Sequence, residues 1–185
     1  YDKLVSIEMI EAVGHRYLPQ YFAACNRLLK PEGLMLLQSI LMPDQRYERS
    51  RHNVDFIQRY IFPGGFLPST GAIATLSGQH TDRQLIDTLD ITAHYADTLA
   101  AWRRRFHADV EAIRALGYSE DFMRLWDYYF CYCEGGFAER QLGDAEHAGE
   151  RRAQFMRNES QKIALGFVQN GKSCVGFGQL SSAGQ

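Results

Sequence analysis

The chain has 185 residues, of which 45% are hydrophobic, and a formal net charge of −2 at pH 7. This length and hydrophobic content suffice for one ordinary domain with its own core. Phosphate binding needs a surplus of lysine and arginine on one face, so the charge balance argues against a nucleic-acid-binding protein. No apolar run in the sequence reaches the roughly 20 residues that span a bilayer, so we expect any membrane contact to be peripheral.

The first third of the chain predicts a strand, a helix and a second strand. Residues 3–7 form a short apolar segment typical of a buried strand that is already under way at Tyr1, so we expect the chain to begin within a domain. Residues 18–29 carry apolar side chains at helical spacing, and residues 34–40 form a nearly continuous apolar strand. This pattern predicts a parallel βαβ unit whose ligand crevice lies at the carboxyl ends of the strands.

The next segment changes character. Residues 44–51 are strongly charged, which favours the solvated face of a helix. The sequence FPGGFLPS at residues 62–69 places two glycines between phenylalanine and proline residues. Such a loop has a fixed shape and presents large apolar groups.

The remaining predicted elements are mainly helical. Residues 70–76 predict the start of a helix, residues 84–91 a third strand, and residues 94–116 one long helix. Ser119 is the expected cap of a further helix that runs to about Arg140. This last helix is apolar almost all round, so we expect it to lie in the core or to line an apolar cavity.

The four cysteines have spacings that match neither a disulfide scaffold nor a paired zinc site. We therefore expect reduced, buried thiols, no bound metal, and a cytoplasmic location.

Four motifs together resemble a known family. They are VSIEMIEAVG at residues 5–14, YIFPGGFLPS at 60–69, HYADTLAAW at 94–102 and YYFCYCEGGF at 128–137. In order and separation they resemble the C-terminal part of the cyclopropane-fatty-acyl-phospholipid synthase and mycolic acid cyclopropane synthase family. The likeness covers roughly residues 1–143.

The resemblance implies a fold and a domain layout. The fold is the C-terminal half of a class I S-adenosylmethionine-dependent methyltransferase, Rossmann-like, with helical substrate-binding insertions. Residues 1–143 are then part of the methyltransferase domain, residues 144–170 a divergent segment with an uncertain final strand at 163–168, and residues 171–185 a disordered tail. The glycine-rich turn and the acidic residue that hold this cofactor do not occur in the sequence, so we expect the chain alone to be inactive.

The resemblance also implies an activity in lipid biosynthesis. Enzymes of this family transfer a methylene group from S-adenosylmethionine to a cis double bond in a phospholipid acyl chain. The alkene attacks the methyl group, a carbocation forms, and loss of a proton closes the ring. The expected partner is a phospholipid with an unsaturated acyl chain, which implies peripheral contact with a membrane. A second copy of the chain, in a homodimer, is a further candidate partner. Two alternatives stay open: a catalytically inactive lipid-binding remnant, and a fatty-acyl methylase that adds a methyl branch.

In that family the proton acceptor is a bound bicarbonate. Matching the motifs places its partners on Glu11, on the Gln38 side chain, on the backbone of Ile40 and on Tyr95. The family pattern has histidine at the position of Gln38; an amide still donates a hydrogen bond but carries no proton. Glu8 ranks second to Glu11 and is assigned either to a supporting polar contact behind the site or to the edge of the cofactor.

The same resemblance implies an apolar slot for the acyl chain. The residues assigned to it come from the glycine-containing loop and from the late helix: Phe62, Pro63, Gly64, Gly65, Phe66, Tyr129 and Cys133.

Overall fold

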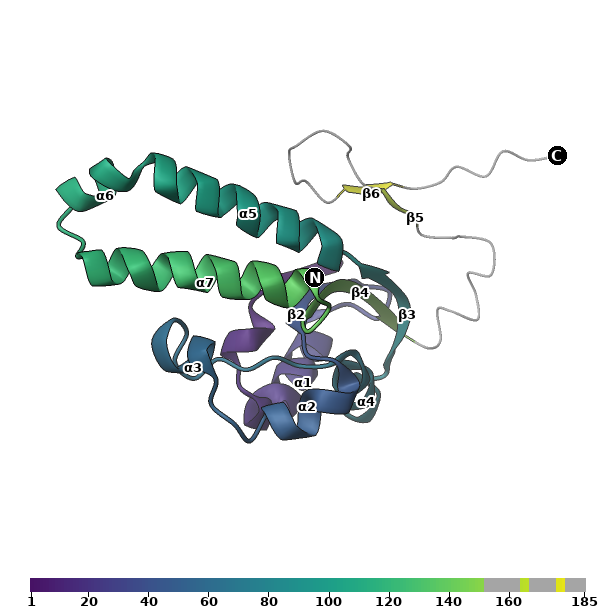
Figure 1. Cartoon of the computed structure of the whole chain (residues 1–185). Coiled ribbons are helices and arrows are strands. Elements are labelled where there is room, and N and C mark those ends of the chain that lie inside the picture. Colours follow the sequence, from purple (N-terminus) through teal and green to yellow (C-terminus); the bar gives the residue numbers. More distant parts are fainter. Residues whose placement is uncertain (152–163, 167–175, 179–185) are drawn as a thin grey trace. The chain divides into compact units, whose positions relative to one another are not determined.

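The computed structural model describes residues 1–151, 164–166 and 176–178 (Figure 1). Residues 1–151 form one compact unit, and the rest of the chain belongs to a second. In the second unit, β5 (Ala164–Gly166) pairs antiparallel with β6 (Gly176–Gly178). The first lies within the strand predicted at 163–168. The second lies within residues 171–185, the segment predicted to be a disordered tail, and the other residues of that segment lie outside the described part.

A four-stranded mixed sheet organises the first unit, in the order β1-β2-β4-β3. Its strands are β1 (Lys3–Ile7), β2 (Leu34–Leu41), β3 (Arg83–Asp90) and β4 (Gly143–Arg151). The first two are parallel and are joined by α1 (Leu18–Leu28), which confirms the predicted βαβ unit. The fourth strand runs antiparallel to both of its neighbours, so it lies inside the sheet.

This inner strand is the main element that the sequence did not predict. We placed a divergent segment from residue 144 onward, whereas the structure continues directly into β4. Its sequence, GDAEHAGER, lacks the β-branched and aromatic residues that strands usually carry. Pairing on both sides buries it all the same, including the polar residues Asp144, Glu146, His147 and Glu150.

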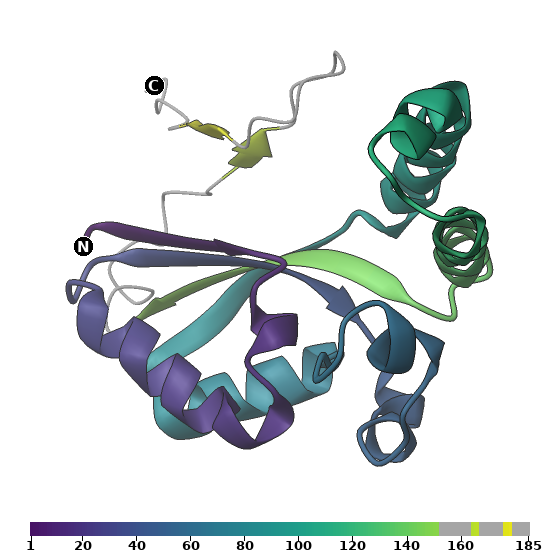
Figure 2. The same ribbon diagram turned by 90° about the vertical axis from the view of Figure 1, so that its left-hand side faces the viewer.

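Two helices pack against one face of the sheet. These are α1 and α4 (Thr70–His80), which lie on the same side in Figure 2. Leu18 and Phe22 from α1, Leu37 from β2 and Ile73 from α4 meet in one core cluster. The 3₁₀ turns η1 (Ile10–Ala12) and η2 (His15–Tyr17) connect β1 to α1.

The first strand is less buried than its sequence suggested. Val5 is 51% exposed and Ile7 is 53% exposed, and only Ser6 is buried in this strand. The strand lies at the edge of the described sheet and therefore has a neighbour on one side only.

A helical pair extends from the sheet (Figure 1). It consists of α5 (Thr92–Ala108) and α7 (Glu120–Ala138), joined through the short α6 (Val110–Ala115). The single helix predicted at 94–116 is therefore interrupted at Asp109. Ser119 caps the last helix as predicted, since its hydroxyl accepts the N–H of Phe122 at 3.2 Å.

The late helix is not buried all round. Its inner face contributes Phe130, Cys133 and Phe137 to a second core cluster around Leu99 of α5, whereas Tyr128 is 54% exposed. Two short helices, α2 (Asp44–Ser50) and α3 (Phe56–Tyr60), precede the glycine-containing loop. The first is the predicted solvated helix, although it buries Tyr47. Of the helices described, none has both the length and the hydrophobicity that a membrane crossing requires.

Arg83 connects β3 to the turn between α1 and β2. Its Nε donates to Asn26 Oδ1 at 2.9 Å, and its two terminal nitrogens donate to the carbonyl oxygens of Lys30 and Gly33. Arg83 and Gly33 are both buried, so the Gly33 carbonyl has little access to water as a replacement donor.

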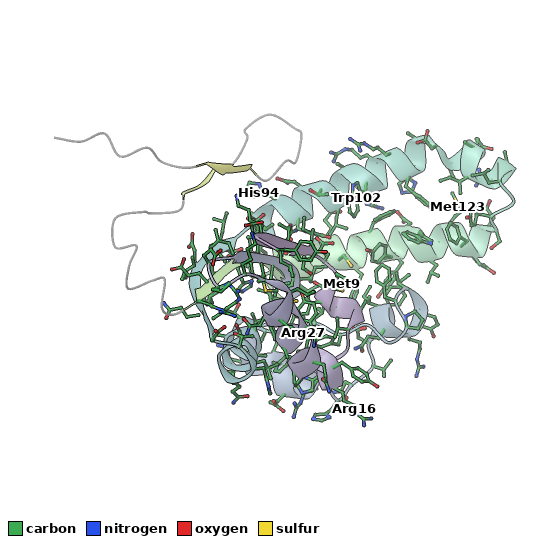
Figure 3. All side chains as sticks on the ribbon, turned by 180° about the vertical axis from the view of Figure 1, so that it is seen from behind. Met9, Arg16, Arg27, His94, Trp102 and Met123 are labelled. Carbon is green, nitrogen blue, oxygen red and sulfur yellow. The ribbon has the colours of Figure 1, made fainter. Side chains whose placement is uncertain are left out.

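We expect Arg83→Met to lower the free energy of unfolding by roughly 2–4 kcal/mol, because it leaves the carbonyl of buried Gly33 and the Oδ1 of Asn26 without the Arg83 donors. Urea denaturation monitored by circular dichroism measures the change. Arg27→Met, on the exposed side of α1 (Figure 3), is the matched control and should change stability by less than about 0.5 kcal/mol. Equal losses in the two variants would contradict this role of Arg83.

Candidate active site

The end of β2 brings two acidic residues together through one amide. Gln38 Nε2 donates to Glu8 Oε1 at 3.2 Å and to Asp144 Oδ2 at 3.2 Å. These residues come from three neighbouring strands: Glu8 follows β1, Gln38 lies in β2, and Asp144 lies in β4. The strand register produces the meeting, since Ile7 pairs with Gln38 and Ile40 pairs with Asp144.

Glu8 has an unusual backbone and two partners for its carboxylate. Its φ of 46° lies in the left-handed region, which costs a non-glycine residue about 1–2 kcal/mol. The backbone N–H of Glu8 donates to the Gln38 carbonyl at 3.0 Å, which holds this conformation. The Tyr95 hydroxyl donates to Glu8 Oε2 at 2.8 Å, so both carboxylate oxygens accept a hydrogen bond.

Tyr95 reaches the site from the first turn of α5. The start of this helix is held against β4, because the Asp144 N–H donates to the Thr92 hydroxyl at 3.0 Å. The Tyr95 ring packs on Phe137, with 4.6 Å between the ring centroids. Figure 3 shows the preceding residue, His94, near the sheet end of α5 and Trp102 farther out along it.

Glu11 and Ile40, which the resemblance assigns as separate partners of bicarbonate, contact each other directly. Its Oε1 accepts the backbone N–H of Ile40 at 2.7 Å, whereas its Oε2 is buried and has no hydrogen-bond partner. Burial raises the pKa of the Glu11 carboxyl, backbone hydrogen bonds oppose the rise, and the neighbouring charge of Glu8 adds to it.

Asp144 is a site residue that sequence reasoning missed. It is fully buried, and its Oδ1 has no hydrogen-bond partner. Burial raises the pKa of its carboxyl to about 7, with a further contribution from the charge of Glu8, while the hydrogen bond from Gln38 lowers it. With Leu41, Thr92 and Arg140, Asp144 also lines a cavity of about 260 Å³.

The residues predicted to hold the acyl chain divide into two groups. Phe62 contacts Tyr129 edge to face, with 6.2 Å between the ring centroids. Cys133 is buried on the same helix, and burial raises the pKa of its thiol to about 12. Phe66 lies elsewhere, in the core cluster under the sheet. None of the predicted acyl-chain residues lines the 260 Å³ cavity.

The glycine-containing loop is tied to the acidic site through its backbone. Phe66 N–H donates to the Glu11 carbonyl at 3.0 Å, and Gln58 Nε2 donates to the Gly65 carbonyl at 2.8 Å. A Cβ at Gly65 would come within 3.1 Å of the Phe62 carbonyl oxygen, so this close turn favours glycine. Exposed Pro63 and Gly64 form its tip, and Gly64 has φ of 83°.

The charges of Glu8, Glu11 and Asp144 are not compensated by ion pairs within residues 1–151. The described residues also contain no group of three or more histidine, cysteine or acidic side chains placed to hold a metal ion. A negative site that lacks a cation of its own favours a positively charged ligand or intermediate.

Comparisons with known proteins found a matching family model and several similar proteins. The family model described as mycolic acid cyclopropane synthetase matches residues 1–145. The chain is 48% identical to the tuberculostearic acid methyltransferase of Mycobacterium tuberculosis over 142 residues, which cover 77% of this chain and 33% of that protein. It is 41% identical to the cyclopropane-fatty-acyl-phospholipid synthase of Escherichia coli over 143 residues, 77% of this chain and 35% of that protein. The chain thus spans about a third of the length of these relatives.

Solved structures show the same fold. The mycolic acid cyclopropane synthase CmaA1, complexed with SAH and CTAB, matches with a TM-score of 0.73 and 27% identity over 81% of this chain and 55% of that one. The cyclopropane synthase MmaA2 from Mycobacterium tuberculosis matches with a TM-score of 0.71 and 24% identity over 80% and 54%. These matches confirm the predicted α/β class I methyltransferase fold.

The Asp144 carboxyl predicts how stability depends on pH. Because its pKa rises from an ordinary value near 3.8 to about 7, the folded state binds more protons than the unfolded state between about pH 4 and pH 7. Stability therefore falls as the pH rises through this window. We expect Asp144→Asn to flatten the pH profile and to raise the free energy of unfolding at pH 8 by roughly 2–4 kcal/mol.

Thermal unfolding between pH 4 and pH 8 measures this effect. Asp87→Asn, at an exposed position of β3, serves as the control and should keep the pH profile of the wild type. An Asp144→Asn variant no more stable than the wild type at pH 8 would show that the buried carboxylate is not destabilising.

Proposed function

The chain belongs to the mycolic acid cyclopropane synthetase family, and from this premise we propose that it serves in methyl transfer from S-adenosylmethionine to a lipid. The proposed substrate is the cis double bond of a phospholipid acyl chain, which implies peripheral contact with a membrane. The proposed product is a cyclopropane ring.

The observation that carries this proposal is the uncompensated group of carboxylates beside aromatic side chains. Alkylation of an alkene by a sulfonium methyl group creates a carbocation. Fixed negative charge in a partly buried site stabilises developing positive charge. The ring of Tyr95, held beside Glu8, adds an attraction of order 1 kcal/mol for a cation on its face.

S-adenosylmethionine fits the charge of this site. It carries a positive sulfonium, and the described carboxylates Glu8 and Glu11 have no ion-pair partner among residues 1–151. When bound, the cofactor supplies the methyl group. We assign to Glu8 and Glu11 the side of the site that faces this positive charge.

Bicarbonate, which the resemblance implies, fits these residues poorly. Its charged oxygens need hydrogen-bond donors, yet the Ile40 N–H donates to Glu11 and the Tyr95 hydroxyl donates to Glu8. Both N–H groups of the Gln38 amide are also used by carboxylates. A further anion would face the charges of Glu8, Glu11 and Asp144, so the proposed chemistry does not involve bicarbonate.

Each side chain of the candidate site has a separate role in this proposal. Gln38 and Tyr95 orient the Glu8 carboxylate. The Glu11 side chain binds the end of β2, and the Glu11 backbone carbonyl binds the glycine-containing loop. Phe62 and Tyr129 supply an apolar wall for the acyl chain.

A fatty-acyl methylase is the second candidate. The identity to the tuberculostearic acid methyltransferase is 48%, against 41% to the cyclopropane synthase of Escherichia coli. The two reactions share methyl transfer to the alkene and differ in the later fate of the cation. Loss of a proton without ring closure gives a methylene-branched alkene with the same mass as the cyclopropane chain, and a saturated methyl branch needs in addition a hydride from a reductant such as a reduced nicotinamide. Mass spectrometry before and after mild catalytic hydrogenation distinguishes the products, because the alkene takes up two hydrogens and the ring does not.

The complete gene product that carries this chain provides the test of function. With a monounsaturated phospholipid, it should consume S-adenosylmethionine and increase the mass of the acyl chain. Glu11→Gln keeps an oxygen for the Ile40 N–H but removes the charge, so we expect turnover to fall about 10- to 100-fold with little change in cofactor affinity. Glu32→Gln, in the exposed turn before β2, is the control. Unchanged turnover in Glu11→Gln would remove Glu11 from the site.

The 185-residue chain by itself is expected to bind S-adenosylmethionine weakly. Its sequence has no glycine-rich turn after a strand to hold the cofactor. Isothermal titration calorimetry measures the affinity, and tight binding would show that this chain holds the cofactor without such a turn.

A further inference from the structure

Two donors that the family resemblance assigns to bicarbonate bind a side chain of the protein instead. The Tyr95 hydroxyl lies 2.8 Å from Glu8 Oε2, and Gln38 Nε2 lies 3.2 Å from Glu8 Oε1. A carboxylate and a bicarbonate ion present the same planar pair of oxygens to such donors. Glu8 therefore occupies the place of the anion with a group that cannot dissociate.

Glu8 is also the most accessible of the three acidic residues. It is exposed, whereas Asp144 is fully buried and the free oxygen of Glu11 is buried. Each carboxylate oxygen has two lone pairs, so Glu8 can accept a proton while Tyr95 and Gln38 hold it. Glu8 thus combines a fixed orientation with an open side.

The backbone conformation of Glu8 also supports a functional role for this residue. Left-handed φ values are uncommon outside glycine, and such strain is found preferentially at functional sites. Here the conformation, which a backbone bond from Glu8 to Gln38 holds, directs the carboxylate toward Tyr95.

We propose that Glu8 is the proton acceptor of the reaction, in place of bicarbonate. This inference rests on the proposed function. After methyl transfer, a C–H bond of the added methyl group breaks and its proton goes to a Glu8 oxygen. The electron pair of that bond forms the new carbon–carbon bond to the cationic carbon and closes the ring. Glu8 becomes a neutral acid and later releases the proton to water. Tyr95 and Gln38 are its positioning residues.

Glu8→Gly in the complete gene product is the test. Glycine adopts a positive φ without strain, so the backbone can stay as it is while the carboxylate is removed. In buffer depleted of carbon dioxide we expect product formation to fall at least about 100-fold, the usual contribution of a catalytic base. Added bicarbonate or formate should restore part of the activity, because Tyr95 and Gln38 are then free to bind a small anion. The wild type should respond to neither.

A binding measurement supplies a readout that does not depend on turnover. Carbon-13 NMR of labelled bicarbonate should show binding to Glu8→Gly and none to the wild type. Glu32→Gly is the matched control, because it makes the same substitution at an exposed carboxylate in the turn before β2. This variant should behave as the wild type in both assays. Circular dichroism confirms that each variant is folded.

The outcomes separate this inference from the proposed function. A wild type that consumes no S-adenosylmethionine with any unsaturated phospholipid overturns the proposed function, and the role of Glu8 with it. An active wild type overturns the inference alone if Glu8→Gly keeps its product formation. Loss of wild-type activity on removal of bicarbonate, or binding of labelled bicarbonate to the wild type, does the same.

Discussion

The bridge that Gln38 makes between two carboxylates is the interaction on which the candidate site depends. One neutral amide offers two N–H groups, and the structure uses one for Glu8 and the other for Asp144. A neutral histidine at this position would offer a single N–H and would leave one carboxylate without that partner. The departure from the family pattern at Gln38 therefore belongs with the acidic residues on either side.

This arrangement has an energetic cost that other contacts must offset. Glu11 and Asp144 each keep a buried oxygen without a hydrogen-bond partner, and burial raises the pKa of both carboxyl groups. Glu8 adds a strained backbone. The two core clusters, around Leu18 and around Leu99, supply the stabilisation that offsets this cost. The carboxylates lower the stability of the fold, but their fixed negative field stabilises a bound cation.

Local sequence patterns were enough to predict the strands that carry one part of the candidate site. The apolar runs of β1 and β2 predict a parallel pair, and that pair brings Glu11 to Ile40. Sequence reasoning did not find Asp144, because β4 has the composition of a surface segment and becomes a strand only through pairing with β2 and β3. The paired residues of β4 lie more than 100 positions from those of β2 and more than 50 from those of β3, so no local stretch of sequence shows the pairing. The contact of Tyr95 with Glu8, rather than with a bound ion, depends on the same long-range packing of α5 on the sheet.

Glu11 connects the acidic residues to the glycine-containing loop. Glu11 contacts Ile40 through its side chain and Phe66 through its backbone carbonyl, so one residue fixes both the strand end and the loop. The core anchors Phe66, while Phe62 at the other end of the same short turn reaches Tyr129. The close approach at Gly65 keeps this turn tight. Glu11 thus contacts both the end of β2, beside the other carboxylates, and the loop that carries Phe62. An acyl chain lying against Phe62 and Tyr129 would therefore have a fixed position relative to the carboxylates.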